Sequence, residues 1–365
     1  MKTRLTYYLM ALLTIYACSS GGSDDGTAGG GNSGGGNSGG GNNTNFWSIP
    51  VNKVIDGGPG RDGIPSIDAP IFFEANNPVV NTYMLPNDLV IGIIKGGEAR
   101  AYPHRILDWH EVVNDEIGGE KFTLNYCPLT GSAFSWESKV GGIETTFGVS
   151  GLLYNTNLIL YDRLTESNWS QLTLECVNGE SIGEVPRNQE ILETNWDTWK
   201  TMYPNTKVLA NEQNLNRNYN SYPYGPYRTD QDFFLFPLDP LNPALPNKQR
   251  VHAVLISNLS KAYTFDKFVG GKAVKDGFGG KNVLVVGNEH IINSFELNTS
   301  QNNLTFTYNF NGSGSFFTDN EGNKWLITGE AIEGPRAGQK LKVTKSFNSY
   351  WFALALFYPN PIIYN

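Results

Sequence analysis

The sequence predicts a mostly β fold with a few helices, of the α+β class, in which two tandem, diverged copies of one β-rich module pack as a single unit. Three observations carry this prediction. Apolar and polar residues alternate over short runs such as residues 122–127, which is the period of a half-buried strand. Aromatic residues, which favour strands, make up 13% of the chain. The motifs of residues 90–205 also recur in the same order between residues 251 and 360.

Within the first copy, each element is predicted from its local pattern. Residues 90–102 predict a hairpin, because an apolar run ends at Gly96-Gly97. Residues 104–117 place apolar side chains at helical spacing, which predicts a helix that ends before Gly118-Gly119. Further strands are expected at residues 132–137, 144–149, 158–163 and 169–174, and a second, short helix at residues 194–202.

The internal repeat rests on matches that keep their order along the chain. Residues 90–103, VIGIIKGGEARAYP, align without gaps with residues 251–264, VHAVLISNLSKAYT. The other matches are Gly118-Gly119 with Gly279-Gly280, Asp162 with Asp319, Trp169 with Trp325, and Trp196 with Trp351. Glycines, aromatic residues and apolar strand residues are shared, whereas Cys127 and His110 have no counterpart. The repeat therefore predicts one chemical site in the first copy and a supporting second copy.

The first 45 residues predict export and a lipid anchor. Residues 1–17 begin with Lys2 and Arg4 and continue into an apolar run, which is typical of a signal peptide. The segment that ends at Cys18 resembles the bacterial lipobox, so Cys18 is the predicted lipidation site. An ordinary secretory signal is the alternative. We expect an extracytoplasmic protein that a lipid anchors to a bacterial membrane, at the periplasmic face or at the cell surface.

Changes in composition divide the chain into six segments. Residues 18–45 are too poor in apolar residues to build a core and predict a flexible linker. The segments are a signal peptide at 1–17, a lipidated Gly/Ser/Asn-rich linker at 18–45, an N-terminal arm at 46–87, the first module copy at 88–210, a Pro/Tyr-rich bridge at 211–248, and a second, degenerate copy at 249–365.

The net charge of the chain limits the classes of partner that we expect. The chain carries 27 basic and 35 acidic residues, and removal of residues 1–17 takes away two of the basic ones. No basic cluster is present, so the sequence argues against nucleic acid as a partner. The lipid is the only expected contact with the membrane, and a small molecule or a glycan is the expected class of ligand.

Four motifs, in order, carry a resemblance to the domain-of-unknown-function family 3179. They are AYPHRILDWHEVVND, NYCPLTGSA, FGVSGLLYNTNLILYDR and NWSQ. The resemblance covers residues 46–365 and implies an exported bacterial or archaeal protein, but no settled activity. The resemblance implies Cys-Pro-Leu-Cys in many members at the place where this chain has Thr130 as the fourth residue. A Cys-x-x-Cys redox pair or a two-thiolate metal clamp is therefore not expected here.

Cys127, His110 and Glu111 are the first candidate catalytic residues. A nearby imidazole stabilises a thiolate, which is then a nucleophile or a soft metal ligand, and Glu111 or Asp115 would orient the imidazole. One thiolate with imidazoles suggests copper or zinc, held by His110 and Cys127. The alternatives are a hydrogen-bonded core histidine with a small buried cysteine, or a disulfide between Cys127 and Cys176.

A second candidate set, for ligand binding, lies on the strands after the glycine-rich FGVSG. Arg163 beside Asp162 suits bidentate recognition of a carboxylate or phosphate, and the alternative is an internal network that braces a hairpin. The set comprises Asn155, Asp162, Arg163, Trp169 and Gln171. His252 and His290, in the second copy, are expected to be ordinary residues.

These candidates lead to three functional hypotheses. The first is an exported lipoprotein of unknown activity with a metal- or thiol-based site in the first copy, and whether it is an enzyme is left open. The second is a lipoprotein that binds a glycan or small molecule, since aromatic side chains can stack on sugars. The third is a purely structural protein of the cell envelope.

Overall fold

The computed structural model describes residues 46–213 and 215–365, so the predicted signal peptide, Cys18 and the linker lie outside the described residues. Strands make up 41% and helices 10% of the chain, which confirms the prediction of a mostly β fold with few helices. None of the described helices combines the length and the apolar character that crossing a bilayer would take.

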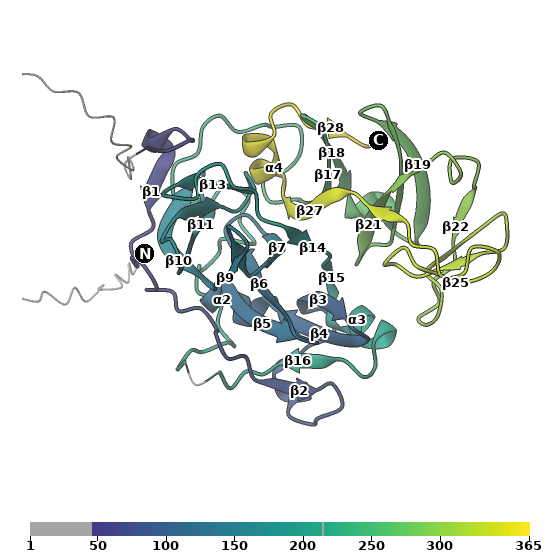
Figure 1. The fold of residues 1–365 in the computed structure, drawn as a ribbon, viewed down its shortest axis with the longest axis horizontal. Helices are drawn as coiled ribbons and strands as arrows, with labels where there is room; N and C mark the ends of the chain where they lie inside the picture. Colours follow the sequence, from purple (N-terminus) through teal and green to yellow (C-terminus); the bar gives the residue numbers. More distant parts are fainter. Residues whose placement is uncertain (1–45, 214) are drawn as a thin grey trace, which may run out of the picture. The chain divides into compact units, whose positions relative to one another are not determined.

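The first sheet is built on the predicted hairpin of residues 90–102 (Figure 1). The hairpin strands pair antiparallel, β15 adds antiparallel to one side, and β16 adds parallel to the other. The strands of this sheet are β3 (Leu89–Lys95), β4 (Glu98–Pro103), β15 (Leu192–Asn195), β16 (Lys207–Leu209) and β2 (Phe72–Glu74). Helix α1 (Val80–Tyr83) lies between β2 and β3 in the sequence.

The predicted helix over residues 104–117 is only partly correct. Helix α2 (His104–His110) ends where Glu111 adopts a φ of 58°, which does not continue a right-handed helix. The residues that follow form β5 (Val112–Ile117), which pairs antiparallel with β6 (Glu120–Cys127). The β-branched Val112 and Val113 favour this strand. The sheet is completed by β7 (Ser132–Glu137) and β14 (Asn188–Gln189).

A third sheet of the first half (residues 46–210) carries two members of the second candidate set, Asp162 and Trp169, on its strands. Its strands are β1 (Val54–Asp56), β10 (Phe147–Tyr154), β11 (Asn157–Asp162), β12 (Asn168–Ser170) and β13 (Glu175–Asn178). Asn155, Arg163 and Gln171 directly follow β10, β11 and β12. The strand expected at residues 169–174 is therefore shorter, and the chain turns after Ser170. Short elements complete this half: η1 (Val51–Lys53), β8 (Lys139–Val140), β9 (Ile143–Glu144) and α3 (Trp196–Met202).

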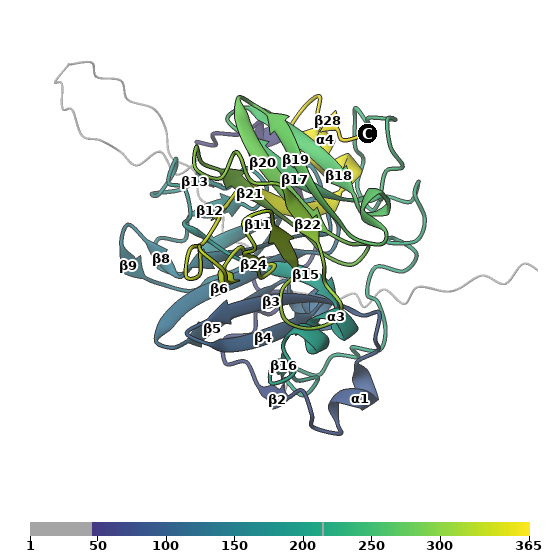
Figure 2. The same ribbon diagram turned by 90° about the vertical axis from the view of Figure 1, so that its right-hand side faces the viewer.

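The second half (residues 249–365) contains three sheets. Figure 2 shows its strands β17, β18 and β20 above β3, β4 and β5 of the first half. Within the first of these sheets, β27 pairs antiparallel with β17 and β28 pairs parallel with β18. Its strands are β17 (Arg250–Ile256), β18 (Leu259–Thr264), β27 (Lys345–Tyr350) and β28 (Ile362–Ile363). Helix α4 (Trp351–Phe357) follows β27, and η2 (Phe265–Phe268) follows β18.

The remaining two sheets of the second half are each four-stranded. One comprises β19 (Lys272–Phe278), β20 (Lys281–Gly287), β21 (Ile292–Leu297) and β26 (Lys342–Val343). The other comprises β22 (Phe306–Tyr308), β23 (Phe317–Asp319), β24 (Lys324–Trp325) and β25 (Ala331–Glu333).

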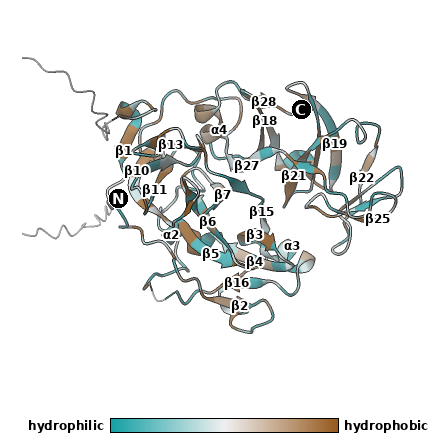
Figure 3. Ribbon diagram, viewed as in Figure 1, coloured by the Kyte–Doolittle hydropathy of each residue, from teal (hydrophilic) through white to brown (hydrophobic). Residues whose placement is uncertain are grey.

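The two halves share buried apolar residues. One hydrophobic cluster contains Tyr102 and Phe122 from the first half together with Phe295 and Trp325 from the second. Figure 3 shows hydrophobic colour on inner strands such as β3 and β10. The bridge between the halves has neither helix nor strand in its described residues, and its Tyr227 is buried with its hydroxyl donating to the Leu129 carbonyl at 2.8 Å. The halves are thus held together by packing as well as by the chain.

Candidate functional site

The thiol of Cys127 lies at the end of β6, inside the first half. It is 1% exposed, and its Sγ lies 3.8 Å from the Thr156 carbonyl oxygen. Glu111 lies at the end of α2, where its carboxylate accepts a hydrogen bond of 3.0 Å from the Tyr224 hydroxyl. Burial, together with the charge of Glu111, raises the pKa of Cys127 to about 11. The protonated thiol therefore dominates at neutral pH, whereas nucleophilic and metal-binding chemistry uses the thiolate.

His110 has partners of its own. Its Nδ1 lies 2.8 Å from the Pro65 carbonyl oxygen, and its Nε2 lies 2.7 Å from the Tyr219 hydroxyl. Burial lowers the pKa of His110 to about 4, so the imidazole is neutral at pH 7. This geometry is that of a hydrogen-bonded core histidine. Neither ring nitrogen is left over to activate Cys127 or to bind a metal.

The state of Cys127 and Cys176 bears on both the disulfide hypothesis and the metal hypothesis. Cys127 and Cys176 are both free and buried, so the alternative of a disulfide between them is not realised. Burial raises the pKa of Cys176 to about 12. Among residues 46–213 and 215–365, no group of three or more His, Cys, Asp or Glu side chains is placed to hold a metal ion. Copper and zinc therefore find no support in this part of the chain.

The second candidate set is divided by the fold. Asp162 accepts a hydrogen bond of 2.9 Å from the Trp169 indole nitrogen, inside the third sheet. Gln171 is fully buried, where it donates to Asn125 at 2.9 Å and accepts from Asn157 at 2.7 Å. Asn155, with a φ of 46°, lies in the turn between β10 and β11. These contacts match the alternative of a network that braces strands.

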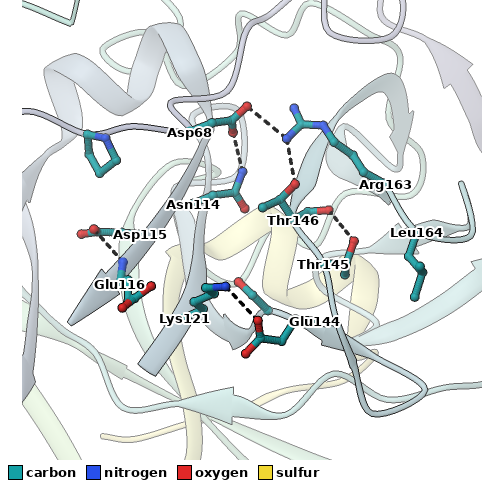
Figure 4. Close-up of a pocket in the computed structure, with 12 residues that line it drawn as sticks. Asp68, Asn114, Asp115, Glu116, Lys121, Glu144, Thr145, Thr146, Arg163 and Leu164 are labelled. Carbon is teal, nitrogen blue, oxygen red and sulfur yellow. Dashed lines mark hydrogen bonds and ion pairs between the residues drawn. The ribbon is translucent and has the colours of Figure 1, made fainter. Parts of the chain in front are cut away.

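Arg163 alone of that set lines a surface hollow, which has a volume of about 620 Å³ (Figure 4). Its guanidinium donates to Asp68 at 3.1 Å, to the Thr146 hydroxyl at 3.0 Å and to the Ser66 hydroxyl at 2.8 Å. The carboxylates that line the hollow outnumber its two cations, Lys121 and Arg163, and are those of Asp68, Asp115, Glu116 and Glu144. An anionic ligand would have to displace existing partners of Arg163 and meet this negative charge.

A larger cleft, with a volume of about 1060 Å³, lies between the two halves. The first half contributes residues of β3, β7, β14 and β15, and the second half contributes residues of β17, β21, β26 and β27. Its walls include the aromatic rings of Phe134, Tyr203 and Phe347. A concave space with apolar walls and a few convergent polar groups is the usual form of a ligand site.

Glu193 is the buried acid of this cleft. It is 7% exposed and accepts hydrogen bonds from Arg250 at 2.6 Å and from the Asn348 amide at 3.0 Å. The His104 Nε2 lies 3.0 Å from the carboxylate, without the alignment of a hydrogen bond. Burial raises the pKa of Glu193, but Arg250 and His104 outweigh it and lower the pKa to about 2. The carboxylate is therefore ionised, and both of its oxygens are already engaged.

His252 extends this network across the second half. Its Nδ1 lies 3.0 Å from the Asn348 Oδ1, and its Nε2 lies 2.8 Å from the Ser294 hydroxyl. Burial lowers the pKa of His252 to about 4. The order Ser–His–Asn is that of a nucleophilic triad. However, Ser294 is 0% exposed, and the Thr344 hydroxyl also lies 2.6 Å from it. A fully buried hydroxyl cannot meet a substrate, so we interpret the chain of contacts as a rigid floor for the cleft.

The sequence did not point to this floor. No sequence pattern indicates a role for Glu193 or Asn348, and the second-copy position of His252 predicts an ordinary residue. The hydrogen-bonded partners lie far apart in the sequence, since the residue numbers of Glu193 and Asn348 differ by 155 and those of His252 and Asn348 by 96. No short motif spans such distances. The one available signal was the aligned pair of hairpins, whose strands supply part of the cleft.

Comparison with known proteins yields one match. The profile of the family described as protein of unknown function (DUF3179) matches residues 61–361, which is most of the chain. Searches among curated proteins and among solved structures found no match. The resemblance carried by the four motifs is thus confirmed, and the chain belongs to this family of proteins of unknown function, DUF3179.

Proposed function

We propose that this protein is an extracytoplasmic, lipid-anchored binding protein that holds a small polar molecule in the cleft between its two halves. The observation that carries the proposal is the cleft of about 1060 Å³ whose floor is set by Glu193, Asn348 and His252. Ligand sites in proteins typically have volumes of roughly 300–1,000 Å³ and a few fixed polar groups. Perturbed pKa values, such as those of Glu193 and His252, also gather at functional sites.

The walls of the cleft support a ligand with an apolar face. Phe134 and Phe347 lie on opposite halves, and their ring centroids are 5.4 Å apart. These two rings are buried against each other, whereas Tyr203, Ile94 and Ile256 line the cleft as half-buried side chains and offer apolar surface to a ligand. This arrangement favours the hypothesis of glycan or small-molecule binding among the three that the sequence left open.

A thiol- or metal-based site at Cys127 has less support. The thiol is buried with a raised pKa, and His110 makes its contacts elsewhere. A purely structural role has less support for a different reason. A structural protein has no need of a large cleft with an ionised carboxylate held beneath it.

The anchor and the location belong to the same proposal. They are supported by the apolar run of residues 1–17, by the lipobox-like residues before Cys18 and by the glycine-rich residues that follow. In this proposal, the residues between Cys18 and the described part of the chain join the lipid to the binding domain.

We further infer that the two halves arose by duplication, so that the cleft lies between two copies of one module. The inference is supported by strand pairing, since β15-β3-β4-β16 and β27-β17-β18-β28 have the same order and the same directions. It is also supported by a shared contact. The Trp169 indole donates to Asp162 at 2.9 Å, and the Trp325 indole donates to Asp319 at 2.8 Å.

A variant that fills the cleft tests the binding proposal. Thr328 lines the cleft and is half-buried, so Thr328→Trp should occupy space that a ligand needs. The measurement is thermal unfolding in the presence of a panel of saccharides, amino acids, dicarboxylates and phosphorylated small molecules. We expect at least one compound to raise the Tm of the wild type, because a ligand at ~100 times its Kd stabilises by about 2.7 kcal/mol.

The same compound should not stabilise Thr328→Trp. The matched control is Thr307→Trp, on an exposed position of β22 outside the cleft, which should keep the full shift. If every stabilising compound acts equally on wild type and Thr328→Trp, the ligand binds elsewhere and the proposal fails. A panel without any stabilising compound also counts against it.

A further inference from the structure

Lysine is concentrated in the cleft of an otherwise acidic chain. The whole chain has 27 basic and 35 acidic residues. The cleft reverses this balance, with five lysines against four glutamates among its lining residues. The lysines are Lys95, Lys281, Lys340, Lys342 and Lys345, and the glutamates are Glu190, Glu193, Glu296 and Glu330. A concave surface with an excess of one charge attracts ligands of the opposite charge.

The excess is local to one group of lysines. Glu296 is shared between Lys281, at 2.7 Å, and Lys342, at 2.9 Å. One carboxylate cannot neutralise two ammonium groups. Lys345 follows Lys342 by three positions and has no ion-pair partner among the described residues. These three lysines therefore face the cleft with a single carboxylate between them.

Lys345 also sits in a concave position. Its side chain is exposed, yet the surrounding protein atoms desolvate it enough to lower its pKa. The neighbouring Thr344 and Ser346 line the cleft as well and bring hydroxyl groups to the same place. An ammonium group that is partly desolvated and lacks a counter-ion gains more from an anion than a fully hydrated one does.

Glu193, the buried acid of the cleft, does not offset the attraction between the lysines and an anionic ligand. Both oxygens of Glu193 accept hydrogen bonds, from Arg250 and from Asn348. A cationic ligand would have to displace one of these partners. Lys95 and Lys340 are paired with Glu120 and Glu190. Glu330 has no ion pair among the described residues, so five lysines against four glutamates leave the lining with an excess of one positive charge.

We propose that the cleft takes an anionic ligand, whose carboxylate or phosphate group pairs with Lys345 in the cleft that Lys281 and Lys342 also line. This inference rests on the proposed function and specifies its class of ligand. The remainder of the ligand would lie against half-buried apolar side chains of the same cleft, such as Ile94 and Ile256.

Calorimetric titration of the full chain with citrate and with inorganic phosphate tests the inference, with maltose as a neutral probe. We expect citrate or phosphate to bind the wild type and to bind Lys345→Gln at least tenfold more weakly. Lys345→Arg should retain binding because it keeps the charge. The matched control is Lys139→Gln, on an exposed position of β8 outside the cleft, which should bind like the wild type. Binding should also weaken as salt rises, since ions screen exposed charges.

Equal affinity in the wild type and Lys345→Gln would overturn the inference, as would failure of both anions to bind. The result also separates this inference from the proposed function. If maltose or another neutral compound binds the wild type but not Thr328→Trp, while citrate and phosphate do not bind, the cleft is a binding site but not one for anions.

Discussion

Two buried groups in the first half, Glu111 and Cys127, both have raised pKa values. Glu111 is 5% exposed, and burial is the main reason that its pKa rises to about 7. The negative charge that Glu111 would carry raises the pKa of Cys127 further. A low-dielectric surrounding penalises the ionised form of both groups. Cys127 and Glu111 therefore resemble buried core residues more than an activated nucleophile and its partner.

The cysteines should accordingly be unreactive in the folded protein. We expect Cys127 and Cys176 to be alkylated much more slowly at pH 7 than an exposed thiol, because both are buried with raised pKa values. The measurement is iodoacetamide labelling of a Cys18→Ser variant, followed by mass spectrometry, with and without denaturant. Rapid labelling of Cys127 in the native state would restore the thiol-site hypothesis.

Glu111 should make the protein less stable as pH rises. The folded pKa of about 7 lies above the ordinary value of 4.5, so the native state binds the proton more tightly than the unfolded state. The stability that this provides is full below pH ~4.5 and is lost as pH rises through ~7, by roughly 3 kcal/mol. Glu111→Gln keeps the shape and an acceptor for Tyr224. We expect this variant to be more stable than the wild type at pH 8, by urea denaturation.

Two histidines act in the opposite direction. The pKa values of His110 and His252 are lowered to about 4 from 6.5, so their contribution to stability is lost as pH falls from about 6.5 to 4. Glu111→Gln should therefore lose stability in acid more steeply than the wild type. The control is Glu116→Gln, at an exposed position of β5, which should follow the wild type at every pH. Parallel curves for Glu111→Gln and the wild type would contradict the argument.

At the scale of elements, single residues decide where a helix gives way to a strand. The stripe from Ile106 to Ile117 fits a helix, but α2 ends at His110 and the remaining residues pair with β6. Pairing competes with helical propensity, and tertiary packing decides between them. Local patterns predicted the β3–β4 hairpin because both of its strands and its Gly-Gly turn lie in one short segment.

The ion pair between β15 and β17 should contribute much more to the free energy of unfolding than an exposed ion pair does. Glu193 on β15 pairs with Arg250 on β17, and its removal leaves the partly buried Arg250 without its carboxylate and the buried Asn348 amide without its acceptor. We expect Glu193→Ala to lower the free energy of unfolding by about 3–5 kcal/mol. The control is Glu190→Ala, whose pair with Lys340 at 2.6 Å is exposed and should contribute about 0–1 kcal/mol. Urea denaturation of both variants at pH 7 gives the comparison, and equal losses would contradict it.

At the scale of the whole molecule, the proposed function requires both a lipid anchor and a ligand-binding cleft. We expect the full-length protein to partition into the membrane fraction and into the detergent phase of Triton X-114. Cys18→Ser should be found in the aqueous phase, because it lacks the residue that would carry the lipid. The control is Ser19→Ala, which leaves Cys18 in place. Membrane association of Cys18→Ser would contradict the anchor, and protease treatment of intact cells would separate the surface from the periplasmic face.

Features that depend on neighbouring residues could be predicted from the sequence. It predicted the mostly β class, the first hairpin and the family, because alternation, turn residues and motifs are properties of short segments. It also identified Cys127, His110 and Glu111 as chemically capable residues, but it could not show that Pro65 and Tyr219 occupy the ring of His110.

The contacts between distant polar residues depend on how the strands pack in three dimensions. Glu193, His252 and Asn348 come from three strands of two halves, and their contacts close over separations of 96 and 155 residues. The same packing leaves Lys345 at the cleft without an ion-pair partner among the described residues, while it buries Cys127. Whether a side chain is exposed, paired or desolvated depends on what the fold places around it. The chemistry of a single residue type does not specify those surroundings.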